Sequence, residues 1–465
     1  MATLIRNGTL LTATDRYEAD VSIEDGVIRN IGRDLPVAPE DEVIDATGRW
    51  VLPGAVDVHT HLDMPFMGTV SADDFFTGTR AAAAGGTTTV VDFAIAPRHG
   101  DYEQTLDAWH ARAEGKAVID YGFHMGVTWF GTPEAETGLR RCVARGVTSF
   151  KCFMAYKGTL SIDDGEMFGL LALSRDLGAT VSVHAENGSI VEALVARHRA
   201  AGHTDPVWHA RSRPSTLEGE ATSRAIVIAR QAGAPLYIVH LTCAEALEAV
   251  RRARAAGQEV HAETCPQYLM FTDEVYERPD FEGAKWVMSP PIRPAGHPEA
   301  LWAGLADGTL EVVATDHCPF QFATQKVMGK HDFSLIPNGA PGVGDRMAVL
   351  YHYGVKTGRI DVHRWIDTCS TRPARLFGLH PQKGTLAVGS DGDVVVFDPK
   401  ATFTFGTAWS EHAVDYSLYE GMPGSGAFDV VLSRGQVVWE RGTFRGRAGA
   451  GRFLHRFPGR TPFPE

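Results

Sequence analysis

A chain of 465 residues is long enough for a large catalytic domain and a smaller second one. Its 44% hydrophobic and 22% charged residues are typical of a globular protein, and a net charge of -13 argues against a nucleic-acid-binding surface, which would show clustered Lys and Arg. The six cysteines are widely spaced and form no CxxC pair, and residues 1–14 lack the features of a signal peptide. No apolar run reaches the ~18 residues needed to span a bilayer. These features predict a cytoplasmic protein with reduced thiols and no membrane partner.

Both ends of the chain are predicted to be rich in β-strands. The strand runs are residues 3–6, 19–24, 27–31, 393–398 and 430–438. Asn7-Gly8 and Asp25-Gly26 are turn signals between the runs at the amino end. Two similar ends that flank a different middle predict one small β-sandwich domain built from both termini.

The middle of the chain alternates strand-like and helix-like segments. The strand candidates are residues 55–59, 87–93, 120–127, 147–155, 180–185, 236–241, 259–264 and 311–316, and the clearest helix candidates are residues 72–84, 217–231 and 244–256. Most strand runs are continuously apolar, as in parallel strands covered on both faces. A doubly wound sheet is the competing layout, but no GxGxxG follows the first strand. The pattern favours an α/β fold with a (β/α)₈ barrel over residues 53–384, beside a β-sandwich of residues 1–52 and 385–465.

Polar side chains fall in or at the ends of these barrel strands, where such barrels place their active sites. The first strand ends in His59-Thr60-His61, and in a strand residues i and i+2 point to the same side, so both imidazoles can reach one metal. The later candidates are Lys151, His184, His240 and Asp316. Taken together and in strand order, these six residues predict one active site.

Four histidines and an aspartate are more ligands than one zinc ion needs, so two metals are expected. Zinc suits this donor set best, with manganese, cobalt or iron as alternatives. A protonated Lys151 would repel the cations, but burial pushes a lysine toward its neutral amine, which can add carbon dioxide to form a carbamate that bridges both metals. Either Lys151 is modified in this way or it belongs to no metal site.

Each of these features alone also has a plain structural explanation. Asp316-His317 could cap a helix, Lys151 could be a salt-bridge partner, and a strand-end HxH alone is a metal site about half the time. The combination is what favours a functional site.

Several longer motifs resemble the amidohydrolase superfamily, and within it the dihydropyrimidinase and D-hydantoinase group. They are VDVHTHLD (56–63), AAAAGGTTT (81–89), SFKCFMAY (149–156), HAEN (184–187), YIVH (237–240), ETCPQYL (263–269), SPPIR (289–293), ATDHCPF (314–320) and IPNG (336–339). The resemblance covers nearly the whole chain, including both β-rich ends.

The resemblance implies a role for each matched residue. His59, His61 and Asp316 would bind one metal, His184 and His240 the second, and N6-carboxylated Lys151 would bridge them. A hydroxide held between the metals would attack the ring carbonyl of a small cyclic amide. Asp316 would act as general base, Tyr156 would stabilise the oxyanion, and the backbone around Ser289 and Asn338 would hold the imide edge of the substrate. The product would be an N-carbamoyl amino acid, and family members are commonly homotetramers, with a homodimer as the alternative.

Related functions compete with this interpretation. Dihydroorotase carries HxHxR, whereas here Asp63 takes the arginine position, where it would repel an anionic substrate. Allantoinase shares the metal ligands and stays open, and a non-catalytic scaffold relative is disfavoured because all six ligands are present. The sequence leaves the substrate, the enantiomer preferred and the native metal undetermined.

Two further observations concern the neighbourhood of the site. Met64, Phe66 and Phe153 form either an apolar pocket for an exocyclic substituent or part of the barrel rim, with equal weight for each. Cys152 and Gly344 depart from the family pattern, which has an aliphatic and an acidic residue there; Cys152 adjoins the bridging lysine and could affect resistance to oxidation.

Overall fold

The structure is a computed structural model that describes residues 2–458. Its centre is a parallel sheet of eight strands in the order β15-β14-β13-β12-β11-β10-β9-β6. The strands are β6 (Ala55–Thr60), β9 (Thr87–Ile95), β10 (Asp120–Gly126), β11 (Ser149–Phe153), β12 (Thr180–His184), β13 (Leu236–Ile238), β14 (Val260–Thr264) and β15 (Val312–Val313). The first and last strands are joined by the buried Arg346, which donates to the carbonyls of Val56 and Val313. The predicted barrel is confirmed.

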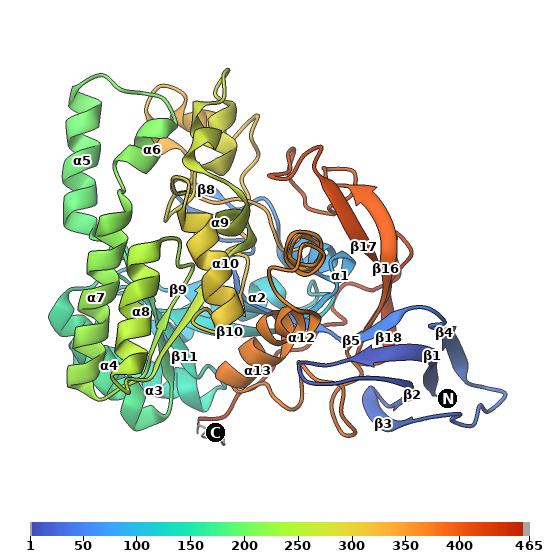
Figure 1. Cartoon of the computed structure of the whole chain (residues 1–465). Coiled ribbons are helices and arrows are strands. Elements are labelled where there is room, and N and C mark those ends of the chain that lie inside the picture. The colour runs from blue at the N-terminus through green and yellow to red at the C-terminus, as the bar shows by residue number, and fades with distance from the viewer. Residues whose placement is uncertain (1, 459–465) are drawn as a thin grey trace.

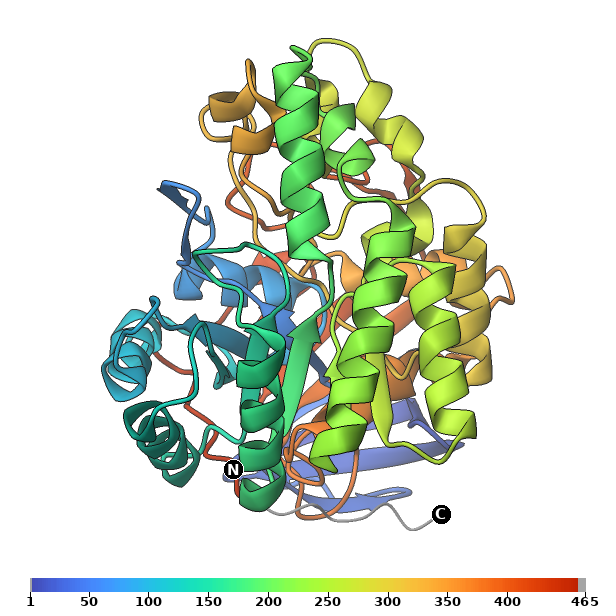
Figure 2. The same ribbon diagram turned by 90° about the vertical axis from the view of Figure 1, so that its left-hand side faces the viewer.

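Helices surround this sheet, as the two views in Figures 1 and 2 show. The helices are α1 (Phe75–Ala84), α2 (Tyr102–Ala113), α3 (Pro133–Ala144), α4 (Asp164–Leu177), α5 (Gly188–Ala200), α6 (Val207–Arg211), α7 (Ser215–Ala232), α8 (Ala244–Ala255), α9 (Pro266–Met270), α10 (His297–Asp307), α11 (Arg346–Leu350), α12 (Val362–Ile366) and α13 (Arg372–Leu376). Shorter turns of helix are η1 (Asp273–Glu277), η2 (Glu282–Trp286), η3 (Lys326–Gly329), η4 (Phe333–Leu335), η5 (Tyr351–Val355) and η6 (Asp367–Thr371). The three helices predicted from sequence correspond to α1, α7 and α8.

Both ends of the chain contribute to one sheet beside the barrel, at the right in Figure 1. Within the described residues it has nine strands: β1 (Thr3–Leu11), β2 (Arg16–Glu24), β3 (Val27–Gly32), β4 (Glu42–Asp45), β5 (Trp50–Pro53), β16 (Val394–Thr404), β17 (Pro423–Ser433), β18 (Gln436–Glu440) and β19 (Thr443–Phe444). Strand β5 joins the two halves by pairing with β1 and β16. Side chains from both halves, such as Val21 and Val430, bury one common core. The predicted β-rich domain is therefore present as one continuous sheet.

Two local predictions in this sheet were wrong. Asn7-Gly8 is not a turn but an irregularity inside β1, where Asn7 has a φ of 62° and the pairing with β2 shifts register. Residues 430–438 are not one strand, because Arg434 and Gly435 adopt φ of 46° and 70° and form the turn between β17 and β18. Both residues of Arg434-Gly435 have a positive φ and reverse the chain, whereas in Asn7-Gly8 Asn7 has a positive φ and the strand continues. Asp25-Gly26, with φ of 52° and 80°, is the expected hairpin turn.

The final described segment lies against the barrel rather than within the sheet. Residues Arg452 and Leu454 exchange backbone hydrogen bonds with Tyr121 of β10. Leu454 belongs to the core cluster that fills one end of the barrel, and Arg456 is buried beside Ser149. Because this segment and the sheet both share core contacts with the barrel, the domain limits at residues 52/53 and 384/385 stay a proposal.

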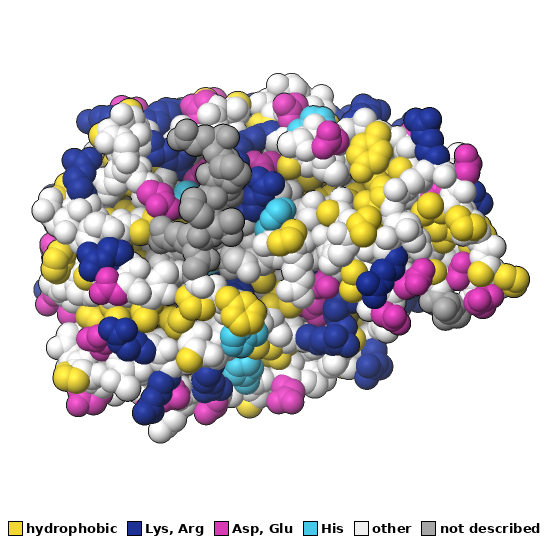
Figure 3. Space-filling model, turned by 90° about the horizontal axis from the view of Figure 1, so that it is seen from below, with side chains coloured by type: hydrophobic (Ala, Val, Ile, Leu, Met, Phe, Trp, Pro, Cys, Tyr) yellow, Lys and Arg dark blue, Asp and Glu magenta, His cyan; other side chains and the backbone are white. Residues whose placement is uncertain are grey.

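No helix among the described residues is long and apolar enough to cross a membrane. On the described part of the face seen in Figure 3, basic and acidic side chains are interspersed rather than gathered into one basic patch. Recognition of a nucleic acid would normally use such a basic patch.

Five of the barrel strands end earlier than predicted, and the largest differences are in β13 and β15. Strand β13 stops at Ile238 and β15 at Val313, although the predicted strands reached Leu241 and Asp316. His240 and Asp316 have φ of 38° and 53°, in the left-handed region that an extended strand excludes. Such conformations are costly for residues other than glycine and cluster at functional sites. The backbone thus leaves the strand where two candidate ligands must turn inward.

Candidate active site

All twelve candidate site residues predicted from the sequence line one cavity of about 50 Å³. They are His59, His61, Met64, Phe66, Lys151, Phe153, Tyr156, His184, Ser289, His240, Asp316 and Asn338. The sequence did not single out Ile95, Leu160, Cys318 and Gly339, which complete the lining. Residues from eight separate stretches of chain therefore meet at one point.

Four imidazoles and one carboxylate converge at the base of the cavity. His59 Nε2 and His61 Nε2 each lie 3.1 Å from Asp316 Oδ1. On the other side, His184 Nδ1 lies 3.0 Å from His240 Nε2. The ring centroids of His59 and His240 are 5.4 Å apart, so the two groups face each other across a narrow gap.

Two carboxylates that sequence reasoning missed orient this cluster. Glu263 Oε1 contacts His59 Nδ1, and Tyr237 donates its hydroxyl to Glu263 Oε2 at 2.7 Å. Glu186 Oε2 lies 2.8 Å from His184 Nε2. In both cases the carboxylate occupies one ring nitrogen and leaves the other directed inward, the arrangement that fixes metal-binding histidines. Glu263 could have been noticed in the sequence as an acidic residue near the end of the predicted strand 259–264.

The contact between Glu263 and His59 leads to a prediction. Glu263→Gln keeps the shape of the side chain but removes the negative charge that contacts His59 Nδ1. We therefore expect metal affinity to fall by ~10–100-fold while the fold is retained. Competition between the protein and a calibrated chelator measures it. Glu248→Gln, on the outer surface of α8, is the control. Equal metal affinity in both variants would show that Glu263 does not support the site.

Burial and charge set the protonation states of the cluster. Burial lowers the pKa of His61 to about 4, and burial together with the Lys151 ammonium lowers that of His240 well below its usual value. Burial opposes ionisation of Asp316, but the imidazoles of His59 and His61 outweigh it and hold the Asp316 pKa well below its usual value. Although burial opposes it, the Glu263 carboxylate raises the pKa of His59, so this imidazole would release a proton on binding a metal, since neutral imidazoles and ionised carboxylates are the forms that bind divalent metals.

Lys151 differs from the other two lysines that are buried in the described chain. Lys383 pairs with the carboxylates of Asp120, Asp391 and Asp393. Lys326 donates to three backbone carbonyls. Among residues 2–458, Lys151 Nζ has no hydrogen-bond acceptor and lies 4.8 Å from the ring centroid of Phe93 and 5.2 Å from that of Phe153. Burial lowers its pKa to about 8.

The donor set fits divalent metal ions. His59 Nε2, which faces Asp316 Oδ1, is a buried nitrogen without a hydrogen-bond partner among the described residues. One ligand atom each from His59, His240 and Asp316 falls within 4.8 Å of the others. Separations of 3.0–3.1 Å between donor atoms suit a tetrahedral ion with bonds of ~2.0–2.1 Å.

The opposite wall carries hydrogen-bonding groups for a ligand. Asn338 Nδ2 donates to Ser289 Oγ at 3.1 Å and lies 3.4 Å from the hydroxyl of Tyr156. Tyr156 has a φ of 65°, and burial raises the pKa of its phenol, so the hydroxyl stays a donor. The Asn338 N–H and the Ser289 carbonyl have no backbone partner among the described residues. This wall therefore offers one donor and one acceptor side by side.

Apolar side chains form the rest of the cavity. Met64 and Phe153 are buried, and Phe66 packs edge-on against Tyr156 with ring centroids 5.8 Å apart. Phe66 belongs to the hairpin of β7 (Pro65–Phe66) and β8 (Thr69–Val70). All three face the cavity, and Met64 also belongs to the main core with Phe66 packed against it, so both interpretations of these residues stay open.

Asp63 does not have the role predicted for it, the repulsion of an anionic substrate in the pocket. Asp63 does not line the cavity, and its carboxylate lies 3.8 Å from Arg112 and 3.9 Å from Lys116. With a φ of 53°, its backbone turns the side chain toward these cations. Its charge is therefore compensated outside the pocket and cannot repel an anionic substrate there. What disfavours such a substrate is the missing arginine alone.

The two departures from the family pattern are buried away from the ligand groups. Cys152 is in the main core, and burial raises its thiol pKa to about 12, so it is a packing residue rather than a reactive thiol. Gly344 donates its N–H to His412 Nε2 at 2.9 Å. A Cβ at Gly344 would lie 3.1 Å from that nitrogen, so His412 occupies the space of a longer side chain.

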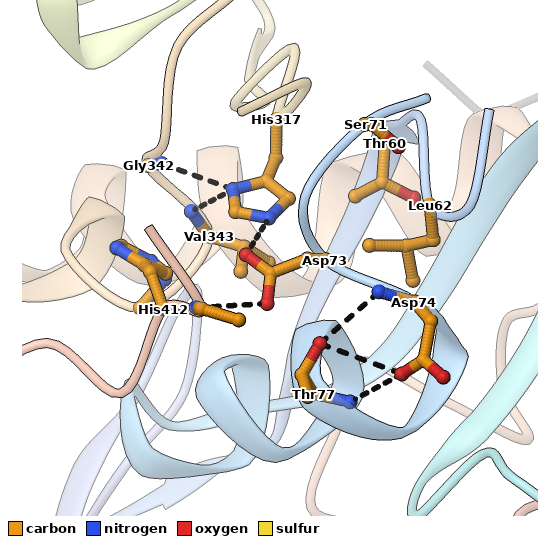
Figure 4. A network of polar contacts seen from close by, with 12 residues as sticks. Thr60, Leu62, Ser71, Asp73, Asp74, Thr77, His317, Gly342, Val343 and His412 are labelled. Carbon is orange, nitrogen blue, oxygen red and sulfur yellow. Dashed lines mark hydrogen bonds and ion pairs between the residues drawn. The ribbon is translucent and has the colours of Figure 1, made fainter. Parts of the chain in front are cut away.

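The residue after Asp316 is held by a network that joins both parts of the molecule. Figure 4 shows His317 between Asp73 and the backbone of Gly342 and Val343. His317 Nε2 lies 3.1 Å from Asp73 Oδ2, and Asp73 Oδ1 accepts from the N–H of Ala413 at 3.0 Å. Both ring nitrogens of His317 are occupied, which fixes the backbone on which Asp316 turns inward.

Comparisons with known proteins agree with this geometry. Residues 50–438 match the model of the amidohydrolase family. The chain is 48% identical to D-hydantoinase of Geobacillus stearothermophilus, covering 98% of this chain and 97% of that protein, and 48% identical to D-hydantoinase of Streptomyces coelicolor, covering 98% of each. The crystal structure of dihydropyrimidinase from Brevibacillus agri superposes with a TM-score of 0.98 at 48% identity, over 99% of this chain and 100% of that one.

Proposed function

The chain belongs to the amidohydrolase family and is a cyclic amide hydrolase, and we propose that it opens the rings of dihydropyrimidines and 5-substituted hydantoins to give N-carbamoyl amino acids. The observation that carries this proposal is the meeting of six ligand-type residues with a free backbone donor and acceptor in one cavity. The names of the relatives, D-hydantoinase and dihydropyrimidinase, support the substrate class. For hydantoins we expect the D-enantiomer to be preferred.

We infer that the site holds two divalent ions, with Zn²⁺ favoured and Mn²⁺ or Co²⁺ as alternatives. His59, His61 and Asp316 would hold one ion and His184 and His240 the other, as their spacing allows. Lys151, whose amine has no other polar partner among the described residues, would bridge the two after taking up carbon dioxide as a carbamate. Divalent metals bound there would lower the pKa of water to about 7 and so would supply a hydroxide nucleophile at neutral pH.

The protein side chains then handle the proton and the charge. Asp316 is ionised and contacts the ligand cluster, so it accepts the proton of the attacking hydroxide and later delivers it to the leaving ring nitrogen. The Tyr156 hydroxyl donates to the oxygen that becomes negative in the transition state. The carbon–nitrogen bond breaks as the nitrogen receives that proton, which leaves a carboxylate and an N-carbamoyl group.

The free backbone groups account for recognition of the ring. An imide edge presents a carbonyl and an N–H side by side, which match the Asn338 N–H and the Ser289 carbonyl. Met64, Phe66 and Phe153 would then receive the substituent at the 5-position. A site that pairs both polar groups rejects rings that lack them, because an unpaired buried group is costly.

Allantoin hydrolysis is the second candidate, because allantoin is a hydantoin whose substituent is polar. The apolar side chains of Met64, Phe66 and Phe153 disfavour that substituent. A scaffold role is disfavoured because every ligand-type residue faces the cavity. We further propose a cytoplasmic homotetramer, with a homodimer as the alternative. The free state of all six cysteines supports a reducing compartment.

Turnover of a substrate panel tests the proposed function. One purified preparation is assayed with dihydrouracil, both enantiomers of 5-phenylhydantoin and allantoin, and the products are identified by mass. We expect hydantoin and dihydrouracil to give N-carbamoyl products, with allantoin at least about tenfold poorer in kcat/KM. Faster turnover of allantoin than of the other rings would reverse the assignment.

A further inference from the structure

Lys326 is a fully buried lysine outside the catalytic cluster, at the start of η3. Its Nζ donates three hydrogen bonds of 2.7 Å, to the carbonyl oxygens of Val287, Pro337 and Gly339. An ammonium group has three donors, so this set satisfies it completely. No carboxylate forms a salt bridge with it among the described residues, and burial lowers its pKa to about 7.

The three carbonyls lie on the two segments that face the ligand. Val287 is two residues before Ser289, and Pro337 and Gly339 flank Asn338 on both sides. The N–H of Gly339 also donates to the Val287 carbonyl at 3.0 Å, which pairs the two segments. Lys326 thus ties together the backbone groups that would receive the imide edge.

The bond to Pro337 has a second effect. The Pro337 carbonyl and the Asn338 N–H belong to the same peptide group. A cationic donor on the carbonyl oxygen polarises that peptide and makes its N–H a stronger donor. Burying a lysine ammonium that contacts only neutral carbonyl groups costs free energy of folding. A residue that only joined the two segments would not need a charged side chain.

We propose that Lys326 is a positioning residue for the substrate: it fixes the Ser289 carbonyl and the Asn338 N–H side by side and strengthens the latter as a donor. This inference rests on the proposed function, because those two backbone groups are assigned there to the imide edge. It identifies a determinant of substrate binding that does not touch the substrate.

Lys326→Met tests the proposal, because methionine keeps an unbranched apolar chain and removes all three donors. We expect KM for hydantoin to rise about tenfold, kcat to stay within about threefold, and the metal content to match the wild type. Lys383→Met is the matched control, because it also removes three bonds from a buried lysine, but far from the cavity. That control should lower the melting temperature and leave KM unchanged.

A substrate change separates positioning from general damage. A 2-thiohydantoin, with sulfur in place of the C2 carbonyl oxygen that the Asn338 N–H would contact, accepts hydrogen bonds weakly and should raise KM of the wild type more than that of Lys326→Met. An equal penalty in both proteins, or an unchanged KM in a folded Lys326→Met, would overturn the proposal. If Lys326→Met does not fold, Lys326→Gln, which retains two N–H donors, should show an intermediate KM, and a native KM would again overturn it. A wild type that hydrolyses no cyclic amide would instead contradict the proposed function.

Discussion

Lys151→Ala should lose both its metal ions and its activity while keeping its fold. Without the amine there is no carbamate to bridge the ions, and the remaining ligands form two separate, incomplete sets. Metal catalysis contributes several kcal/mol to a transition state, so we expect kcat to fall ~10³-fold or more. Metal content by elemental analysis and kcat for hydantoin are the two measurements.

Lys157→Ala is the control for this variant, because Lys157 is exposed on the loop that follows the same strand. It should retain about the wild-type metal content and kcat. A Lys151→Ala protein that still binds two ions per chain and turns over hydantoin would refute the bridging role. The mass of the untreated wild-type protein should exceed the sequence mass by one carbon dioxide, provided that acid is avoided.

Asp316→Asn should abolish most turnover with little change in shape. The amide is isosteric with the carboxylate but cannot accept the proton of the hydroxide, and general base catalysis is worth about 10²–10⁴ in rate. The loss should appear in kcat, since the recognition groups on the opposite wall are untouched. Metal loss adds to the effect, so kcat is measured with metal in excess.

Asp63→Asn serves as the matched control for Asp316→Asn. Asp63 is also an aspartate with a left-handed φ near the barrel rim, but it pairs with Arg112 and Lys116 outside the cavity. Its kcat should stay within about threefold of the wild type. If Asp316→Asn, loaded with metal, keeps its kcat within tenfold of the wild type, Asp316 is not the general base.

Much of the site could be predicted because its ligands fall on a repeating local pattern. His59, His184 and the residues near the ends of later strands follow short apolar runs, and a barrel brings such positions to one face. The pattern of short apolar strand runs therefore predicted where each ligand lies without information on which residues it contacts.

The residues that were missed depend on contacts between distant parts of the chain. Glu263 meets His59 across 204 residues, and Lys326 joins segments whose spacing in sequence has no period. The path of residues 452–456 along the barrel was missed for the same reason. Asp63 was misinterpreted because the sequence shows its position in the motif but not the direction of its side chain, which its φ of 53° sets.

The central claim is that these six residues form a two-metal site that hydrolyses cyclic amides. Its most direct test combines metal analysis and hydantoin turnover on one gently purified preparation. The account predicts about two divalent ions per chain and formation of N-carbamoyl amino acid that stops on chelation and resumes when metal is restored. Less than one ion per chain, together with no turnover of hydantoin or dihydrouracil after metal addition, would contradict it.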